Sequence, residues 1–225
     1  MKYIYLFLVF VFVSCASQEL KQDAVELKEI SFLALGDSYT IGEGVEKTAR
    51  WPNQFVSIAK EKGVLFSEPE IIAKTGWKTY DLLSDIQKKK NTKKYDFITL
   101  LIGVNNQYNA LPLEIFKEGL DSILFEINNF IKPTAKVLII SIPDWGVTPY
   151  AKSFEPNKIS QEIDVYNAVL ETFAKDNGFP FVDVTTISRR ASEEGELLTS
   201  DSLHPSSKMY EAWAKKIFDS YIKKK

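Results

Sequence analysis

The sequence predicts an α/β fold in which helices cover both faces of a five-stranded parallel sheet. Short apolar runs alternate with longer segments of helical period, as in consecutive β-α-β units. Within the runs, successive residues are hydrophobic, which is typical of strands buried on both sides. The 225 residues, with 45% hydrophobic and 26% charged side chains, suffice for one domain with a single core.

Five strands and five helices are expected in order. The expected strands are ISFLAL (30–35), EIIAK (70–74), FITLLI (97–102), VLIISI (137–142) and FVDV (181–184). Helices are expected at 53–62, at 79–88, at 113–131 after Pro112, and after Pro205. A further helix is indicated by one apolar stripe with spacings of three and four residues: Ile159, Ile163, Tyr166, Leu170 and Phe173.

The N-terminus resembles the export signal of bacterial lipoproteins. Lys2 precedes an apolar run over 3–13 that is too short to span a membrane, and Cys15 is the only cysteine. In such signals the cysteine becomes the mature N-terminus and carries acyl chains that anchor the protein. We therefore expect a signal peptide over 1–14, a tether over 15–29 and a folded domain over 30–225. The expected location is the periplasm or cell surface, anchored to a membrane through lipidated Cys15; the alternative is a plain secretory signal with an unused cysteine.

The charge of the chain argues against a nucleic-acid partner. Proteins that bind a phosphate backbone normally carry a basic excess, whereas the formal charge here is −2. Short lysine clusters within 88–94 and at 223–225 are typical of a solvated surface.

Residues with catalytic chemistry follow the expected strands. The carboxyl ends of parallel strands meet at one edge of a sheet, where ligands bind. Ser38 follows the first strand, Gly76 the second and Asn105 the third. Asp201 lies beyond the fifth strand, three residues before His204, the only histidine. Taken singly, each motif also fits a turn or a helix cap, but their joint placement favours a hydrolytic site.

Each of these residues has a role in acyl transfer. A serine hydroxyl needs a base to become a good nucleophile, and a histidine held by a carboxylate suits that role. We expect Ser38 as nucleophile, His204 as base and Asp201 as the carboxylate, with Asp37 as the less favoured alternative. The oxyanion would be held by the backbone N–H groups of Ser38 and Gly76 and by the Asn105 amide.

In this order the motifs GDSYT, KTGW, GVNN and DSLH resemble the four blocks of the SGNH hydrolases, the GDSL esterase/lipase superfamily. The resemblance spans residues 31–222. It implies a flavodoxin-like three-layer α/β/α sandwich and an acyl-serine mechanism on esters or thioesters that uses no metal and no cofactor. One departure is Asn106, because the third block usually reads Gly-x-Asn-Asp.

Three functions fit these observations. We predict an exported esterase that acts on short-chain esters or on O-acetyl groups of carbohydrate. The alternatives are a lysophospholipase or thioesterase for long acyl chains, and an inactive surface lipoprotein that binds glycan or lipid, to which Asn106 points. Trp77 and Trp145 either pack at the rim or contact the substrate. The loop over 145–157 is expected to form one wall of the site.

Overall fold

The computed structural model describes residues 2, 29–89 and 93–223. Cys15, the signal peptide apart from Lys2 and the tether apart from Glu29 lie outside the described residues, so the expectations for them stay predictions. Among the described residues, no helix has both the length and the apolar character needed to cross a membrane.

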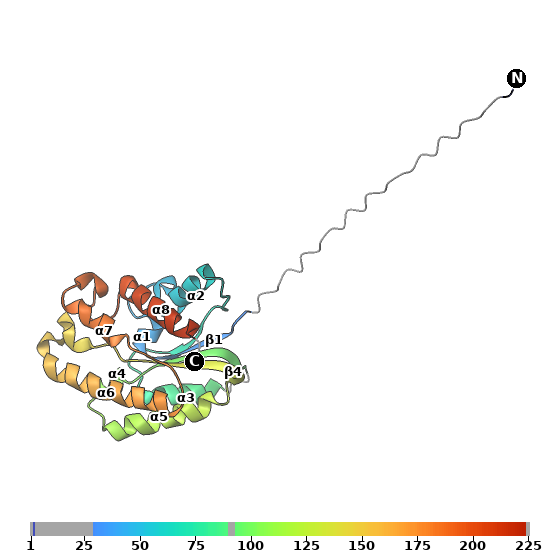
Figure 1. Cartoon of the computed structure of the whole chain (residues 1–225). Helices are drawn as coiled ribbons and strands as arrows, with labels where there is room; N and C mark the ends of the chain where they lie inside the picture. Colours follow the sequence, from blue (N-terminus) through green and yellow to red (C-terminus); the bar gives the residue numbers. More distant parts are fainter. Residues whose placement is uncertain (1, 3–28, 90–92, 224–225) are drawn as a thin grey trace.

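Five parallel strands form one sheet in the order β2-β1-β3-β4-β5 (Figure 1). The strands are β1 Phe32–Gly36, β2 Glu70–Ala73, β3 Tyr95–Leu101, β4 Ile131–Ile140 and β5 Phe181–Val182. The chain moves from β1 to one side of the sheet for β2 and to the other side for β3. Ligands of open α/β sheets bind outside the carboxyl ends of the strands at such a reversal.

Helices on both faces complete three layers, which confirms the predicted fold class (Figure 1). One face carries α2 (Trp51–Glu61) and α8 (Ser207–Ile222), which pack together. The other face carries α3 (Thr79–Lys89), α5 (Leu113–Ile127) and α6 (Pro156–Asp176). Three short helices follow carboxyl ends of strands: α1 (Ser38–Ile41), α4 (Val104–Tyr108) and α7 (Thr185–Ser188).

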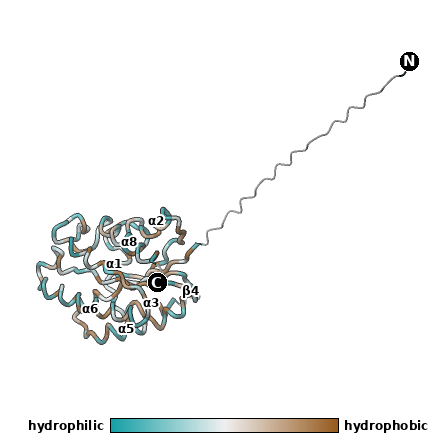
Figure 2. The backbone as a smooth tube through the Cα atoms, viewed as in Figure 1, coloured by the Kyte–Doolittle hydropathy of each residue, from teal (hydrophilic) through white to brown (hydrophobic). Residues whose placement is uncertain are grey.

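The core lies between the sheet and its helices. All five residues of β1 are buried, and Figure 2 shows hydrophobic colouring along the central strands. Phe32 of β1 packs against Phe55 of α2 and Phe97 of β3, with ring centroids 5.4 and 4.8 Å apart. These contacts anchor the start of β1, and the site is built from the opposite, carboxyl end of this strand.

One helix ends earlier than the sequence predicts. The helix expected over 113–131 ends at Ile127, and residues from Ile131 onward form β4. Pro133 explains part of this difference, because a proline disfavours helical backbone in the residue before it. Strand β4 therefore begins earlier than the expected 137, although its buried half, Val137 to Ile140, lies where the sequence predicts it.

Candidate active site

A cavity of about 180 Å³ lies at the carboxyl edge of the sheet. Its lining comes from the segments after β1, β2, β3 and β4 and from the loop before α8: Ser38, Tyr39, Thr75, Gly76, Val104, Asn105, Tyr108, Trp145, Tyr150, Leu203 and His204. In the part of the chain that the structure describes, no three His, Cys, Asp or Glu side chains are grouped to hold a metal ion. The cavity thus brings together five of the residues that the sequence predicts for the site.

Ser38 is the first residue of α1, directly after the turn that ends β1. The Asp37 carboxylate stabilises this turn by accepting a hydrogen bond of 3.0 Å from the backbone N–H of Tyr39. A Cβ atom at Gly36 would lie 2.4 Å from the carbonyl oxygen of Leu101 in β3. Only glycine permits such a close approach of the two strands, so the Gly-Asp-Ser sequence fixes where the Ser38 hydroxyl lies.

Asp37 is fully buried, and its Oδ2 has no hydrogen-bond partner among the described residues. Burial raises the pKa of Asp37 to about 7, and the backbone hydrogen bond from Tyr39 opposes this shift only in part. Asp37 Oδ1 accepts a hydrogen bond within the turn and none from His204. Of the two carboxylates considered from the sequence, Asp201 is the one in contact with the histidine ring.

The Asp201 carboxylate orients His204. Asp201 Oδ2 lies 2.6 Å from His204 Nδ1. Asp201 Oδ1 accepts hydrogen bonds from the backbone N–H groups of Leu203 and His204, both at 2.9 Å, and from the Thr199 hydroxyl at 2.7 Å. Partial burial alone would raise the pKa of Asp201, but these hydrogen bonds outweigh it and hold the pKa well below its usual range. A carboxylate that stays ionised favours a proton on Nδ1, which leaves Nε2 as an acceptor.

Ser38 and His204 line the same cavity from opposite ends of the chain. The His204 ring also packs beside Tyr39, with the ring centroids 5.7 Å apart. No hydrogen bond joins the Ser38 hydroxyl to the histidine ring within the described residues. The two groups are nevertheless placed so that one small molecule in the cavity can touch both.

Three hydrogen-bond donors face this cavity. Gly76 has a φ of +82°, a backbone conformation that glycine adopts without strain. The backbone N–H groups of Ser38 and Gly76 donate to no other described residue. Asn105 Nδ2 donates a hydrogen bond of 3.0 Å to the carbonyl oxygen of Trp77, which fixes the amide and leaves its second N–H available. Such a set of donors can hold an oxygen atom that acquires negative charge.

Asn106, the departure from the family motif, lies behind the site. Its side chain is fully buried and is not part of the cavity lining. Asn106 Oδ1 accepts a hydrogen bond of 3.0 Å from the backbone N–H of Thr79, and its Nδ2 donates one of 3.1 Å to the Thr79 hydroxyl. Asn106 therefore caps the start of α3 without placing a charge in the core. Because this side chain does not line the cavity, the change from Asp to Asn leaves the lining of the cavity intact.

The two tryptophans expected at the site differ in position. Trp145 lines the cavity, and its indole N–H donates a hydrogen bond of 2.8 Å to Gln107 Oε1. Gln107 Nε2 in turn donates one of 2.7 Å to Glu162 of α6. The half-buried Trp77 side chain packs against the core instead and is absent from the lining, so the cavity gives no support to a substrate contact by Trp77.

Sequence reasoning missed three tyrosines of the lining, Tyr39, Tyr108 and Tyr150. Tyr39 follows Ser38 directly, Tyr108 ends helix α4, which begins within the Gly-x-Asn motif, and Tyr150 belongs to the loop expected to form a wall. Their proximity to these motifs was the available signal, but the sequence does not indicate which way a loop aromatic side chain points.

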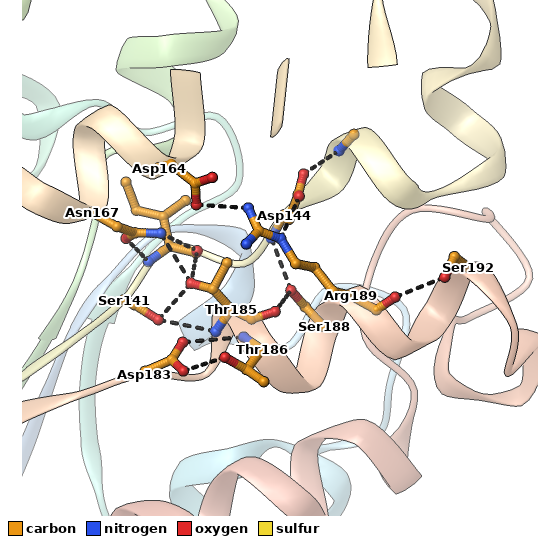
Figure 3. Close-up of polar contacts among 12 residues, drawn as sticks. Ser141, Asp144, Asp164, Asn167, Asp183, Thr185, Thr186, Ser188, Arg189 and Ser192 are labelled. Atoms are coloured by element: carbon orange, nitrogen blue, oxygen red, sulfur yellow. Dashed lines mark hydrogen bonds and ion pairs between the residues drawn. The ribbon is translucent and has the colours of Figure 1, made fainter. Parts of the chain in front are cut away.

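An ion pair between buried Asp144 and partly exposed Arg189 holds the loop that carries Trp145. Asp144 is buried and accepts hydrogen bonds of 2.9 Å from Arg189 Nε and from the backbone N–H of Gly146. Figure 3 shows Arg189 between Asp144 and Asp164. Arg189 Nη2 donates a hydrogen bond of 2.7 Å to Asp164 Oδ1. The segments after β4 and β5 are thereby tied together behind the cavity.

Comparisons with known proteins agree with this architecture. A sequence model of the GDSL-like Lipase/Acylhydrolase family matches residues 34–212. The structure of TesA superimposes with a TM-score of 0.68 at 14% identity and covers 85% of this chain and 98% of its own. The lipase Lip_vut3 from a goat rumen metagenome gives 0.67 at 20% identity, with coverages of 85% and 97%.

The acetylxylan esterase Axe2 from Geobacillus stearothermophilus gives a TM-score of 0.65 at 16% identity, with coverages of 88% and 97%. No curated protein matches the sequence. At these identities the structural likeness shows the fold alone. The family is shown by the sequence model, because its match covers most of the chain. The protein therefore belongs to the GDSL-like lipase/acylhydrolase family and is a carboxylic ester hydrolase.

Proposed function

We propose that the protein is a serine esterase that removes short acyl groups, among them O-acetyl groups on carbohydrate. The size of the cavity carries this proposal. Its volume of about 180 Å³ is below the roughly 300–1,000 Å³ of pockets that enclose drug-sized ligands. A short acyl group fits such a space, whereas a long acyl chain would have to extend beyond it.

In the first half of the proposed reaction, Ser38 Oγ attacks the carbonyl carbon of the ester while His204 Nε2 takes the hydroxyl proton. Asp201 keeps the imidazole oriented and stabilises the imidazolium that forms. The negative oxygen of the tetrahedral intermediate is held by the N–H groups of Ser38 and Gly76 and by the Asn105 amide. His204 then returns the proton to the leaving alcohol, and the acyl group remains on Ser38.

In the second half, a water molecule attacks the acyl-serine ester. His204 takes a proton from this water, the same donors hold the second oxyanion, and the bond to Ser38 Oγ breaks as His204 protonates that oxygen. The products are the free acid and the original enzyme, so the cycle needs no other reactant than water.

Hydrolysis of p-nitrophenyl esters from acetyl to palmitoyl tests this proposal. We expect the largest kcat/KM for acetyl to butyryl esters and a loss of about 10⁶-fold in kcat for Ser38→Ala. Ser57→Ala, which changes an exposed serine of α2, serves as the control and should match the natural protein. A palmitoyl optimum would point to a lipid enzyme instead, and full activity of Ser38→Ala would exclude the mechanism.

The role of Asn105 is tested separately with Asn105→Ala. Loss of one oxyanion donor typically lowers kcat by roughly 10²- to 10³-fold. KM should change little, because the donor acts mainly on charge that develops in the transition state. A raised KM with an unchanged kcat would assign Asn105 to substrate binding alone.

We also propose that the exported protein is anchored to a membrane by lipidation of Cys15. The apolar run over 3–13 that precedes this single cysteine supports the proposal. In bacteria that express the full chain, Cys15→Ser should move the protein from the membrane fraction to the soluble fraction. Unchanged fractionation would exclude a lipid anchor at this position.

A further inference from the structure

Four aromatic side chains gather at the mouth of the cavity. Tyr108 ends α4, and Trp145, Tyr150 and Phe154 belong to the segment between β4 and α6. Trp145 is central, with ring centroids 5.3 Å from both Tyr108 and Phe154. Tyr150 and Phe154 are nearly parallel, at 5.7 Å and 26°. We call these four residues the aromatic platform.

The platform has a buried floor and an exposed surface. Trp145 is only 4% exposed and is held through Gln107, whereas Tyr108, Tyr150 and Phe154 are 46, 40 and 45% exposed. These three are among the eight large apolar side chains that are exposed in the described part of the chain. A contiguous group of exposed apolar rings beside a cavity is a candidate binding surface.

The position of the platform connects it to the proposed chemistry. Tyr108, Trp145 and Tyr150 also line the cavity that contains Ser38 and His204. The backbone N–H of Tyr150 donates a hydrogen bond of 3.2 Å to the carbonyl oxygen of Ser202, in the loop that carries His204. A substrate with its acyl group in the cavity would therefore extend its remaining part over the platform.

The chemistry of the exposed surface favours a sugar over a hydrocarbon chain. The hydroxyl oxygens of Tyr108 and Tyr150 lie 3.2 Å apart and share a hydrogen bond. A hydrocarbon chain cannot form hydrogen bonds with these hydroxyl groups. A pyranose ring has an apolar face of C–H groups that packs on aromatic rings, and hydroxyls on its edge that reach such polar groups.

We propose that the aromatic platform binds a pyranose ring of the acylated carbohydrate whose acyl group enters the cavity. This inference rests on the proposed short-acyl esterase function and adds the binding site for the alcohol part. Phe154 supplies a stacking surface, and the Tyr108 and Tyr150 hydroxyls bond to the sugar edge. Phe154 lies outside the cavity lining, which allows sugar binding to be changed with little effect on the acyl pocket.

Binding is measured first without turnover. We would titrate the Ser38→Ala protein calorimetrically with xylohexaose, cellohexaose and chitohexaose, none of which carries an ester. At least one should bind, and adding Phe154→Ala should weaken its affinity by about tenfold, since one aromatic contact contributes up to about that factor. Phe125→Ala, which removes a 72% exposed ring on α5, is the matched control and should leave the affinity unchanged.

Turnover is measured second, with the acetylated form of the sugar that binds and with ethyl acetate. Phe154→Ala should lower kcat/KM about tenfold more for the sugar ester than for ethyl acetate, mainly through KM. Absence of binding by all three sugars, or equal affinity of the Phe154→Ala protein, would overturn the platform. Sugar binding by a natural protein that hydrolyses neither ester would instead reject the esterase function and leave the platform intact.

Discussion

Asp201 Oδ2 lies 2.6 Å from His204 Nδ1, while Asp201 Oδ1 accepts three further hydrogen bonds. Two of those three come from the backbone of the turn that joins the two residues. The carboxylate, the imidazole and the turn therefore form one unit within a short stretch of the chain.

Asp201→Asn tests this unit. The amide can present its NH₂ group to Nδ1 and thereby favour the tautomer with the proton on Nε2, which cannot act as a base toward Ser38. We expect kcat for p-nitrophenyl acetate to fall by up to about 10⁴-fold with a native circular dichroism spectrum. Asp183→Asn, which alters a carboxylate that accepts hydrogen bonds from Thr186, is the control and should keep its activity. A loss of less than about threefold would argue against the role of Asp201.

The buried carboxyl of Asp37 predicts a stability that declines as the pH rises. Its pKa is raised from 3.8 to about 7, so between these values the unfolded chain has released a proton that the folded chain still holds. The free energy of unfolding then falls with rising pH across this window and levels off above about pH 7. About three pH units at about 1.4 kcal/mol each correspond to about 4 kcal/mol.

Urea denaturation of Asp37→Asn at pH 5 and pH 8 measures this effect. The variant lacks the titrating group, so the difference in unfolding free energy between the two pH values should be smaller than in the natural protein. The comparison between the two proteins cancels the titration of the other groups. Identical pH dependence in both would mean that Asp37 is ionised in the fold.

Substitutions of Asn106 test whether this position requires only a hydrogen-bond acceptor for the Thr79 N–H or also a negative charge. Asn106→Asp retains an acceptor for the Thr79 N–H, so activity should stay within about threefold. Asn106→Leu leaves that buried N–H unpaired, and we expect a loss of about 1–3 kcal/mol in unfolding free energy. Thermal denaturation and p-nitrophenyl acetate hydrolysis measure the two effects. An inactive but stable Asn106→Asp protein would contradict this explanation.

The ion pair between buried Asp144 and partly exposed Arg189 predicts a loss of stability when the arginine is removed. Arg189→Met takes the charged partner from the buried Asp144 carboxylate, which should lower the unfolding free energy by about 1–3 kcal/mol. Arg190→Met removes only an exposed pair with Glu194 and should cost less than about 1 kcal/mol. Chemical denaturation distinguishes the two, and equal effects would show that Asp144 does not depend on Arg189.

Much of this structure is predictable because buried strands and helix stripes produce different hydrophobic periods. The placement of Ser38, Gly76 and Asn105 follows from parallel strands ending at one edge. The end of α5 is not predictable in this way, since apolar residues continue past it through Phe130 and Ile131 into β4. Trp77 was expected at the site on its proximity to Gly76 alone, but side-chain direction in a loop depends on tertiary packing.

The cavity is lined by residues that lie outside the five strands, most of them in connecting segments. Natural variation or laboratory mutagenesis can therefore change the exposed residues between Trp145 and Phe154 while the buried strands keep their sequence. Recognition of the alcohol would then evolve independently of the buried strands. A library restricted to the exposed residues of this segment, namely Pro149, Tyr150, Lys152, Ser153 and Phe154, would then redirect specificity with little effect on expression of the protein.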